Sequence, residues 1–270
     1  MSKDSNINIK GFIEDFLHER DKDYLKKNPY SKMDPEFIYN EFSLQFELGF
    51  YLREKLKNDE YKVYFEKNIK ELIEEKFNNN EIKSVEKNIP KKKKLEKYIK
   101  ECLEKYVKEN LKTFIKKEMD LCVEKKDGDK IIERYSIELK FPTNGAYPRR
   151  MSQFLEDIQF MEQVKPFSDN GIKSKTYCLS LIDVERQGIP FMALEKGYDG
   201  DDEKIYPFFR STESYDSSKK EFEAIKEIKD YEIKKKDTKG LILDFNIKGP
   251  YLIKWEKIND RFWYYLLETV

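Results

Sequence analysis

The segment KEMDLCVEKKDGDKIIERYSIELKF, Lys117–Phe141, alternates apolar and polar residues on both sides of a turn at 127–129. Alternation with a period of two predicts two half-buried strands, and Asp127-Gly128-Asp129 between them predicts a hairpin. Successive side chains of a strand point to opposite faces of the sheet, so one face of this hairpin is expected to be apolar. Its expected members are Met119, Leu121, Val123, Tyr135, Ile137, Leu139 and Phe141.

The other face of the hairpin holds acidic side chains and an amine. It carries Asp120 on the first strand and Glu138 and Lys140 on the second. A three-residue loop places Asp120 opposite Ser136, with Glu138 as its diagonal neighbour on the same face. A slip by one residue would expose an apolar row, so the hydrophobic pattern favours this register. We therefore expect Asp120, Glu138 and Lys140 to converge.

This arrangement of residues resembles the core motif of the PD-(D/E)xK nuclease superfamily, which has the restriction-endonuclease-like fold. Asp120 is followed eighteen positions later by Glu138-Leu139-Lys140 on the adjacent strand, and Met119 stands where proline is common in that superfamily. The resemblance covers roughly residues 35–185. It implies an α/β fold in which a mixed central β-sheet is flanked by helices in the order α-β-β-β-α-β.

A helix is expected over residues 35–56, with Asp34 as its N-cap and Pro35 at its first position. Glu41 lies on the stripe of this helix that faces the core. The resemblance implies that the helix before the first core strand brings a glutamate to the metal site, and Glu41 matches that role. Glu47 is the second choice, and solvated helix charges are the alternative for both residues.

Other segments fit the same order of elements. Alternation over 60–66 predicts the first core strand, whereas charge-rich residues 70–113 indicate a helical insertion. The lysine run at 91–94 either contacts phosphates or forms a solvated helix face. Apolar spacing then predicts a helix over 150–164 and a buried strand over 176–182. The order helix, strand, hairpin, helix, strand is the one that the resemblance implies.

We expect three parts in the chain: an N-terminal segment at 1–34, a nuclease-like core at 35–185 that contains the helical insertion, and a C-terminal β extension at 186–270 packed on the core. A short helix is expected near 218–229. Turns at Gly249-Pro250 and Asn259-Asp260 join strands at the end of the chain. Aromatic residues there either stack on bases or pack in the core, and their alternation favours packing. They are Tyr251, Trp255, Phe262, Trp263, Tyr264 and Tyr265.

Composition limits the chemistry that is possible. The 53 basic and 53 acidic residues cancel, so any binding of nucleic acid must come from a local patch. Cys102, Cys122 and Cys178 are far apart among apolar neighbours, which indicates reduced core residues and neither disulfides nor a zinc site. His18 is the only histidine, so carboxylates and lysine must carry any catalysis. Because the chain has no apolar run of bilayer length and the start MSKDSNINIK lacks the apolar core of a signal peptide, we expect a cytoplasmic protein without a membrane partner.

The resemblance implies hydrolysis of phosphodiester bonds with Mg²⁺, for which Mn²⁺ can substitute. The expected ligands are Asp120, Glu138, the Leu139 carbonyl and Glu41, while Lys140 orients the attacking water or stabilises the transition state. The expected activity is that of an endonuclease on DNA, in restriction or another anti-phage role, with RNA as the alternative substrate.

A loop with proline and glycine follows the second strand and emerges beside Lys140. It supplies the residues expected to contact the substrate backbone, which are Asn144, Tyr147, Arg149 and Arg150. The rival function from another class is a module that binds nucleic acid or protein without cutting it. A homodimer is compatible with either function.

Overall fold

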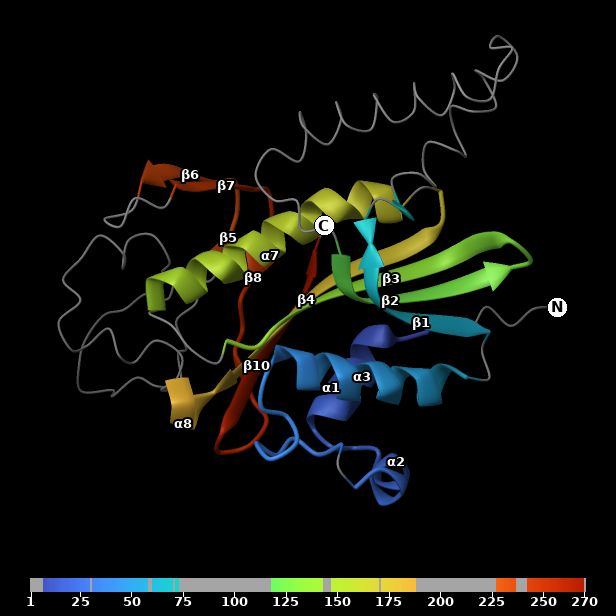
Figure 1. The fold of residues 1–270 in the computed structure, drawn as a ribbon. Helices are drawn as coiled ribbons and strands as arrows, with labels where there is room; N and C mark the ends of the chain where they lie inside the picture. The colour runs from blue at the N-terminus through green and yellow to red at the C-terminus, as the bar shows by residue number, and fades with distance from the viewer. Residues whose placement is uncertain are drawn as a thin grey trace, which may run out of the picture.

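The computed structural model describes residues 7–29, 31–57, 60–69, 71–72, 118–142, 147–169, 171–187, 227–236 and 242–269. These residues form a mixed α/β structure in which a six-stranded mixed sheet is flanked by helices, which confirms the expected fold class at this level (Figure 1). The elements of the first half are α1 Ile9–Leu17, α2 Lys22–Lys27, α3 Glu41–Leu56, β1 Tyr61–Asn68, β2 Glu118–Asp127 and β3 Lys130–Lys140. Those of the second half are α7 Tyr147–Ser168, β4 Lys173–Asp183, α8 Val184–Gln187, β5 Glu227–Ile228, β6 Tyr231–Lys236, β7 Ile242–Ile247, β8 Tyr251–Leu252, β9 Glu256–Lys257 and β10 Phe262–Thr269.

The strands of the main sheet follow the order β1-β2-β3-β4-β10-β9. β1, β2 and β3 are antiparallel neighbours, and β4 runs parallel to β3. A parallel neighbour requires a crossover connection, which α7 provides. The predicted order of helix, strand, hairpin, helix and strand is therefore confirmed as α3, β1, β2–β3, α7 and β4.

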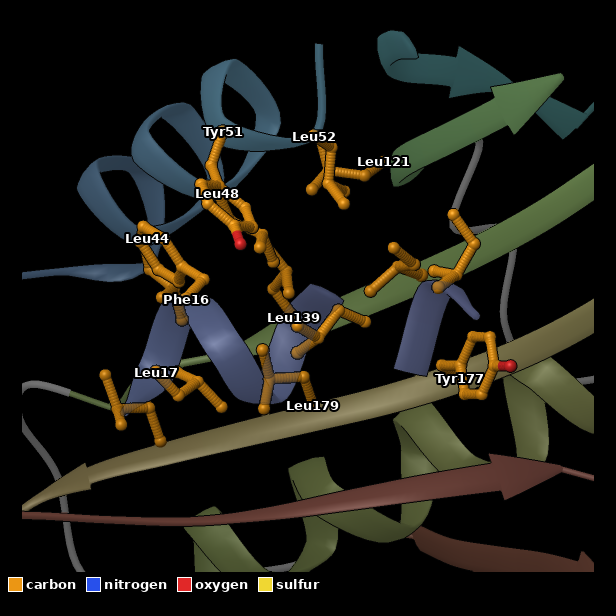
Figure 2. Close-up of a cluster of buried hydrophobic side chains, with 14 of the residues drawn as sticks. Phe16, Leu17, Leu44, Leu48, Tyr51, Leu52, Leu121, Leu139, Tyr177 and Leu179 are labelled. Carbon is orange, nitrogen blue, oxygen red and sulfur yellow. The ribbon is translucent and has the colours of Figure 1, made fainter. Parts of the chain in front are cut away.

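Each face of the sheet is covered by its own hydrophobic cluster. The α3-side cluster contains residues of α1 and α3, and Figure 2 shows Leu44 and Leu48 of α3 above Leu139 and Leu179 of the sheet. The α7-side cluster contains residues of α7 together with Cys178 and others from the opposite sheet face. β4 contributes to both clusters, which confirms the prediction of a strand buried on both faces.

Helix α3 begins at Glu41, so the expected start at residue 35 is wrong. The Asn40 side chain accepts a hydrogen bond from the Ser43 amide at 2.8 Å, and the Ser43 hydroxyl accepts one from the Asn40 amide at 3.0 Å. This reciprocal capping box satisfies two amides at the helix start. It places Glu41 in the first turn of α3, where the helix meets the end of β3.

The hairpin register differs from the predicted one. Cys122, and not Asp120, is paired with Ser136. One residue of this difference comes from the loop, which has two residues and not three because Asp127 pairs with Lys130, and the other comes from a shift of the pairing between Lys125 and Lys126. Such an irregularity adds a residue to one strand and cannot be read from alternation. The pairing ends with Leu121 opposite Ile137, and beyond it the Leu139 amide donates to the Asp120 side chain at 2.7 Å.

Met119 also departs from the prediction, because it lies in the α7-side cluster while Leu121 and Val123 lie in the α3-side cluster. The partner of Met119 on β1 is Lys67. The residue before Lys67 is Glu66, which has a left-handed φ of 51°. A residue of this conformation interrupts the alternation of a strand, so the two strand ends pack towards α7.

The C-terminal strands extend the main sheet, since β10 pairs with β4 along its whole length. The six aromatic residues singled out in this region are all buried, so they pack in the core and do not form a base-stacking surface. Residues 227–228 form β5, which pairs with β8, so the expected helix is wrong at this end. Residues 218–226 of the expected helix, and residues 70 and 73–113 of the expected insertion, lie outside the described ranges.

Two smaller expectations can be compared with the structure. Cys122 and Cys178 are buried thiols in the core, as predicted, and Cys102 lies outside the described residues. In the parts of the chain that the structure describes, no helix is both long and apolar enough to cross a membrane.

Candidate functional site

The candidate site lies where the end of β3 meets the first turn of α3. Lys140 is the last residue of β3, and its Nζ lies 3.0 Å from Oε2 of Glu41. The Phe141 amide donates to the same carboxylate oxygen at 3.2 Å. Oδ2 of Asp157 from α7 lies 3.9 Å from the same Nζ. Three elements that are far apart in sequence therefore meet at Lys140.

Asp120 is held against the same strand end. Its Oδ2 accepts a hydrogen bond of 2.7 Å from the Leu139 amide, which belongs to the residue just before Lys140. Its backbone carbonyl accepts one of 2.7 Å from Nε2 of Gln45, one turn after Glu41 on α3. Both β3 and α3 thus fix the position of Asp120.

Glu138, the remaining member of the predicted group, lies within β3. It lies two residues before Lys140, so both side chains point to the same sheet face. Its register partner on the parallel strand β4 is Cys178, which belongs to the α7-side cluster. Glu138 is only 1% exposed, so this carboxylate lies beneath the surface of the site.

The charge on Lys140 is set by opposing effects. Burial lowers the pKa of Lys140, but Asp157 and then Glu41 raise it, and the net result is a pKa above the usual value. The side chain is therefore an ammonium group at neutral pH. Because Asp120 acts on it as well, three carboxylates surround this one cation.

The donor atoms suit a hard divalent cation in kind. Carboxylate and carbonyl oxygens are the ligands that Mg²⁺ and Mn²⁺ prefer, and Asp120, Glu138, Glu41 and the Leu139 carbonyl offer them. Within the described ranges, no three His, Cys, Asp or Glu side chains are arranged as ligands of one ion. Glu41 contacts Lys140, and Asp120 contacts the Leu139 amide.

Several other predicted site residues lie elsewhere. Glu47, the second choice on α3, accepts a hydrogen bond from Ser31 and lines a groove between α2 and α3, so it is not brought to Lys140. Asn144 lies outside the described residues, as do the side chains of Tyr147, Arg149 and Arg150. The prediction that these three residues lie on a loop is wrong, because α7 already begins at Tyr147.

Sequence reasoning missed two polar residues of the site, Gln45 and Asp157. Gln45 is buried four residues after Glu41 on the core-facing stripe of α3. Asp157 is 7% exposed and lies between Leu155 and Ile158 on the buried face of α7. A polar residue within an apolar stripe is the signal that marks both positions.

Comparison of the chain with protein-family models, with curated proteins and with solved structures found no match.

Proposed function

We propose that this chain is a nuclease of the PD-(D/E)xK type, which uses Mg²⁺ to hydrolyse phosphodiester bonds within DNA. The observation that carries the proposal is the contact of Lys140 with Glu41 at the strand end where the adjacent Leu139 amide binds Asp120. An acidic residue from each of α3 and β2 thus meets the Glu138-Leu139-Lys140 segment of β3. A lysine whose pKa is shifted by several neighbouring carboxylates is a candidate for a functional site.

The order of the strands supports a restriction-endonuclease-like core. Antiparallel β1, β2 and β3, the crossover helix α7 and parallel β4 follow the α-β-β-β-α-β order once α3 is included. The choice of DNA over RNA, and a role in restriction or another anti-phage function, are proposed by analogy with this fold.

Each residue of the site has a role in this proposal. Asp120, Glu138, Glu41 and the Leu139 carbonyl would hold the ion, which supplies a water of lowered pKa and a sink for negative charge. The Lys140 ammonium group donates to a nonbridging oxygen of the scissile phosphate and stabilises its developing charge.

Residues around these groups keep them in place. Gln45 fixes the backbone of Asp120, and Asp157 holds the Lys140 ammonium group from the side of α7. Both contacts come from helices, and helices position site residues more precisely than loops do.

The test is cleavage of supercoiled plasmid DNA by the pure protein, with Mg²⁺, with Mn²⁺ or with a chelator. We expect cleavage with either metal, and a loss of at least about 100-fold in Asp120→Ala and in Lys140→Ala. Glu118→Ala removes an exposed acid from the same strand as Asp120 and is expected to cut as the wild type does. Cleavage that persists in Asp120→Ala or without metal would refute the proposal.

One observation favours a second candidate, a domain that binds nucleic acid without cutting it. The Glu41 and Asp120 carboxylates each contact protein donors, Lys140 and the Leu139 amide, and these contacts also stabilise a site without metal. This candidate predicts DNA or RNA binding that a chelator leaves unchanged, together with intact plasmid after long incubation with Mg²⁺.

A further inference from the structure

Three phenylalanines form an exposed aromatic ridge on α3. Phe42, Phe46 and Phe50 are 62%, 44% and 40% exposed, and they follow one another at intervals of four residues. The rings of Phe42 and Phe46 are stacked with their centroids 5.9 Å apart, and those of Phe46 and Phe50 meet edge to face at 4.5 Å. The core-facing side of the same helix is already filled by leucines, so packing within the described chain does not explain this ridge.

The aromatic ridge is braced from below by β1. The Phe65 ring lies 6.1 Å, centroid to centroid, from both Phe46 and Phe50. Gly49 permits this approach, because a Cβ there would lie 2.3 Å from Cζ of Phe65. The rings are thus held as a fixed surface.

The ridge leads into a groove between α2 and α3. Residues four apart on a helix advance by slightly more than one turn, so the ridge slants round α3 by about 40° at each step. Phe50 thereby becomes a wall of a cavity of about 440 Å³. Most of the other lining residues are polar, and they include Lys27, Asn28, Ser31, Glu47 and Arg53.

An aromatic wall among hydrogen-bonding groups suits a planar ligand with polar edges. Ser31 donates a hydrogen bond to one oxygen of Glu47, which orients the carboxylate. A carboxylate accepts hydrogen bonds from the amino groups of cytosine or guanine, whereas thymine has no amino group. The groove therefore has the chemistry to receive a nucleobase.

A cation is fixed along the side of the ridge. The guanidinium carbon of Arg53 lies 4.7 Å from the ring centroid of Phe65 and 5.8 Å from that of Phe50. Nη2 of Arg53 donates a hydrogen bond to the Val63 carbonyl at 3.0 Å, which holds the side chain in this position. Arg53 remains exposed, and Lys27 lies across the groove, so both can contact phosphates.

A second copy of the chain fits the ridge less well. A phenylalanine buries about 150–250 Å² when fully covered, so the exposed parts of the ridge amount to roughly 300 Å² per protomer. A stable interface needs about 1,200 Å² in total, which two such ridges do not reach. Stacked bases need only the ring faces, and each contributes about 1–3 kcal/mol.

We propose that the aromatic ridge and the adjoining groove bind unpaired nucleotides of a nucleic acid strand, with bases stacked on the ridge and one base edge presented to Glu47. This inference rests on the proposed function in one respect: the nuclease site brings the nucleic acid strand to the ridge, since Phe42 directly follows the site residue Glu41. The substrate is then a nucleic acid with a single-stranded part.

The test is the fluorescence anisotropy of labelled single-stranded oligonucleotides, measured with a chelator and compared with a duplex of the same length. Phe46→Ala and Phe50→Ala are expected to weaken single-strand binding about tenfold and to leave duplex binding unchanged. Leu252→Ala removes an apolar side chain that is 58% exposed on β8, and it serves as the matched control. Wild-type protein is expected to prefer oligo(dC) to oligo(dT), and Glu47→Gln is expected to reduce this preference.

Binding that is equal in wild type and both phenylalanine variants would overturn the inference. So would a dimer, seen by light scattering, that Phe46→Ala dissociates, because the ridge would then be an interface between two copies. The outcomes separate this inference from the proposed function. If single-strand binding depends on the ridge but no cleavage occurs, only the nuclease proposal is refuted. If metal-dependent cleavage occurs but single-strand binding does not depend on the ridge, only the inference about the ridge is refuted.

Discussion

Lys140 and Glu41 are 99 positions apart in the sequence, and their charged groups lie 3.0 Å apart at the junction of β3 and α3. The contact is the structural basis of the proposed site, because it aligns the helix-borne carboxylate with the strand that carries Glu138 and Lys140. The contact also leads to a prediction that separates the effect of the charge of Glu41 from the effect of its shape.

Glu41→Gln keeps the size of the side chain and removes its charge. We expect Mg²⁺-dependent cleavage to fall at least about tenfold and the Mg²⁺ concentration for half-maximal cleavage to rise, because one oxygen ligand loses its charge. The measurement is initial cleavage rate against Mg²⁺ concentration. Glu36→Gln, an exposed residue shortly before α3, should behave as the wild type, and an unchanged metal requirement in Glu41→Gln would remove Glu41 from the site.

The buried ion triad of Glu124, Lys67 and Arg134 supports the same sheet. Oε1 of Glu124 lies 2.5 Å from the Lys67 ammonium group and 2.7 Å from Nε of Arg134, and all three side chains are almost fully buried. Glu124→Ala leaves two buried cations, which we expect to lower the free energy of unfolding by about 3–5 kcal/mol. Urea denaturation measures this loss. Asp127→Ala, at the exposed end of β2, should change it by no more than about 0.5 kcal/mol.

The same triad makes the stability depend on pH. Burial alone would raise the pKa of Glu124, but Arg134 and Lys67 offset it and hold the pKa below the usual glutamate value. A carboxylate with a lowered folded-state pKa stabilises the fold above its unfolded-state pKa, and this contribution is lost as pH falls through the folded-state value. The difference in unfolding free energy between wild type and Glu124→Gln should therefore shrink from pH 7 to pH 3. A difference that stays constant with pH would show that protonation of Glu124 is not coupled to folding.

Gly249 lies in the turn between β7 and β8, where the backbone needs glycine for two reasons. Its φ is 65°, and a Cβ would lie 2.1 Å from the Ile228 carbonyl oxygen. The turn is fixed to α7, because the Gly249 amide and the Tyr251 hydroxyl donate to Glu162 at 3.0 Å and 2.6 Å. Gly249→Ala should therefore cost more than the roughly 1–2 kcal/mol expected from the left-handed backbone alone.

Gly171 provides the matched control for that substitution. Its φ of 71° is similar, but no atom lies within 4 Å of a Cβ placed there. Gly171→Ala thus measures the backbone effect without the clash. Equal losses of unfolding free energy in the two variants would show that the turn moves to accept the new Cβ.

The hairpin shows which features alternation can predict. Period two identified β2 and β3 and correctly placed Glu138 and Lys140 on one face, because side-chain direction in a strand is a local property. The register was wrong by two residues at Ser136, because the loop has two residues and not three, and because the shift at Lys125 and Lys126 leaves the pattern of apolar residues almost unchanged.

Helix α3 shows the same division between local and tertiary information. The core-facing stripe with Glu41 was predicted correctly, whereas the helix start was wrong because the capping box of Asn40 and Ser43 prevailed over Pro35. Gln45 and Asp157 could not be assigned to the site, since their contacts join α3 and α7 to strands far away in the sequence.

The most direct measurement of the proposed metal site is isothermal titration calorimetry of Mn²⁺ into the full chain. We predict saturable binding at the site in the wild type, binding at least about tenfold weaker in Asp120→Asn, and unchanged binding in Glu118→Gln from the exposed end of the same strand. The absence of saturable binding, or equal affinity in Asp120→Asn and the wild type, would contradict a metal-dependent nuclease site at the end of β3.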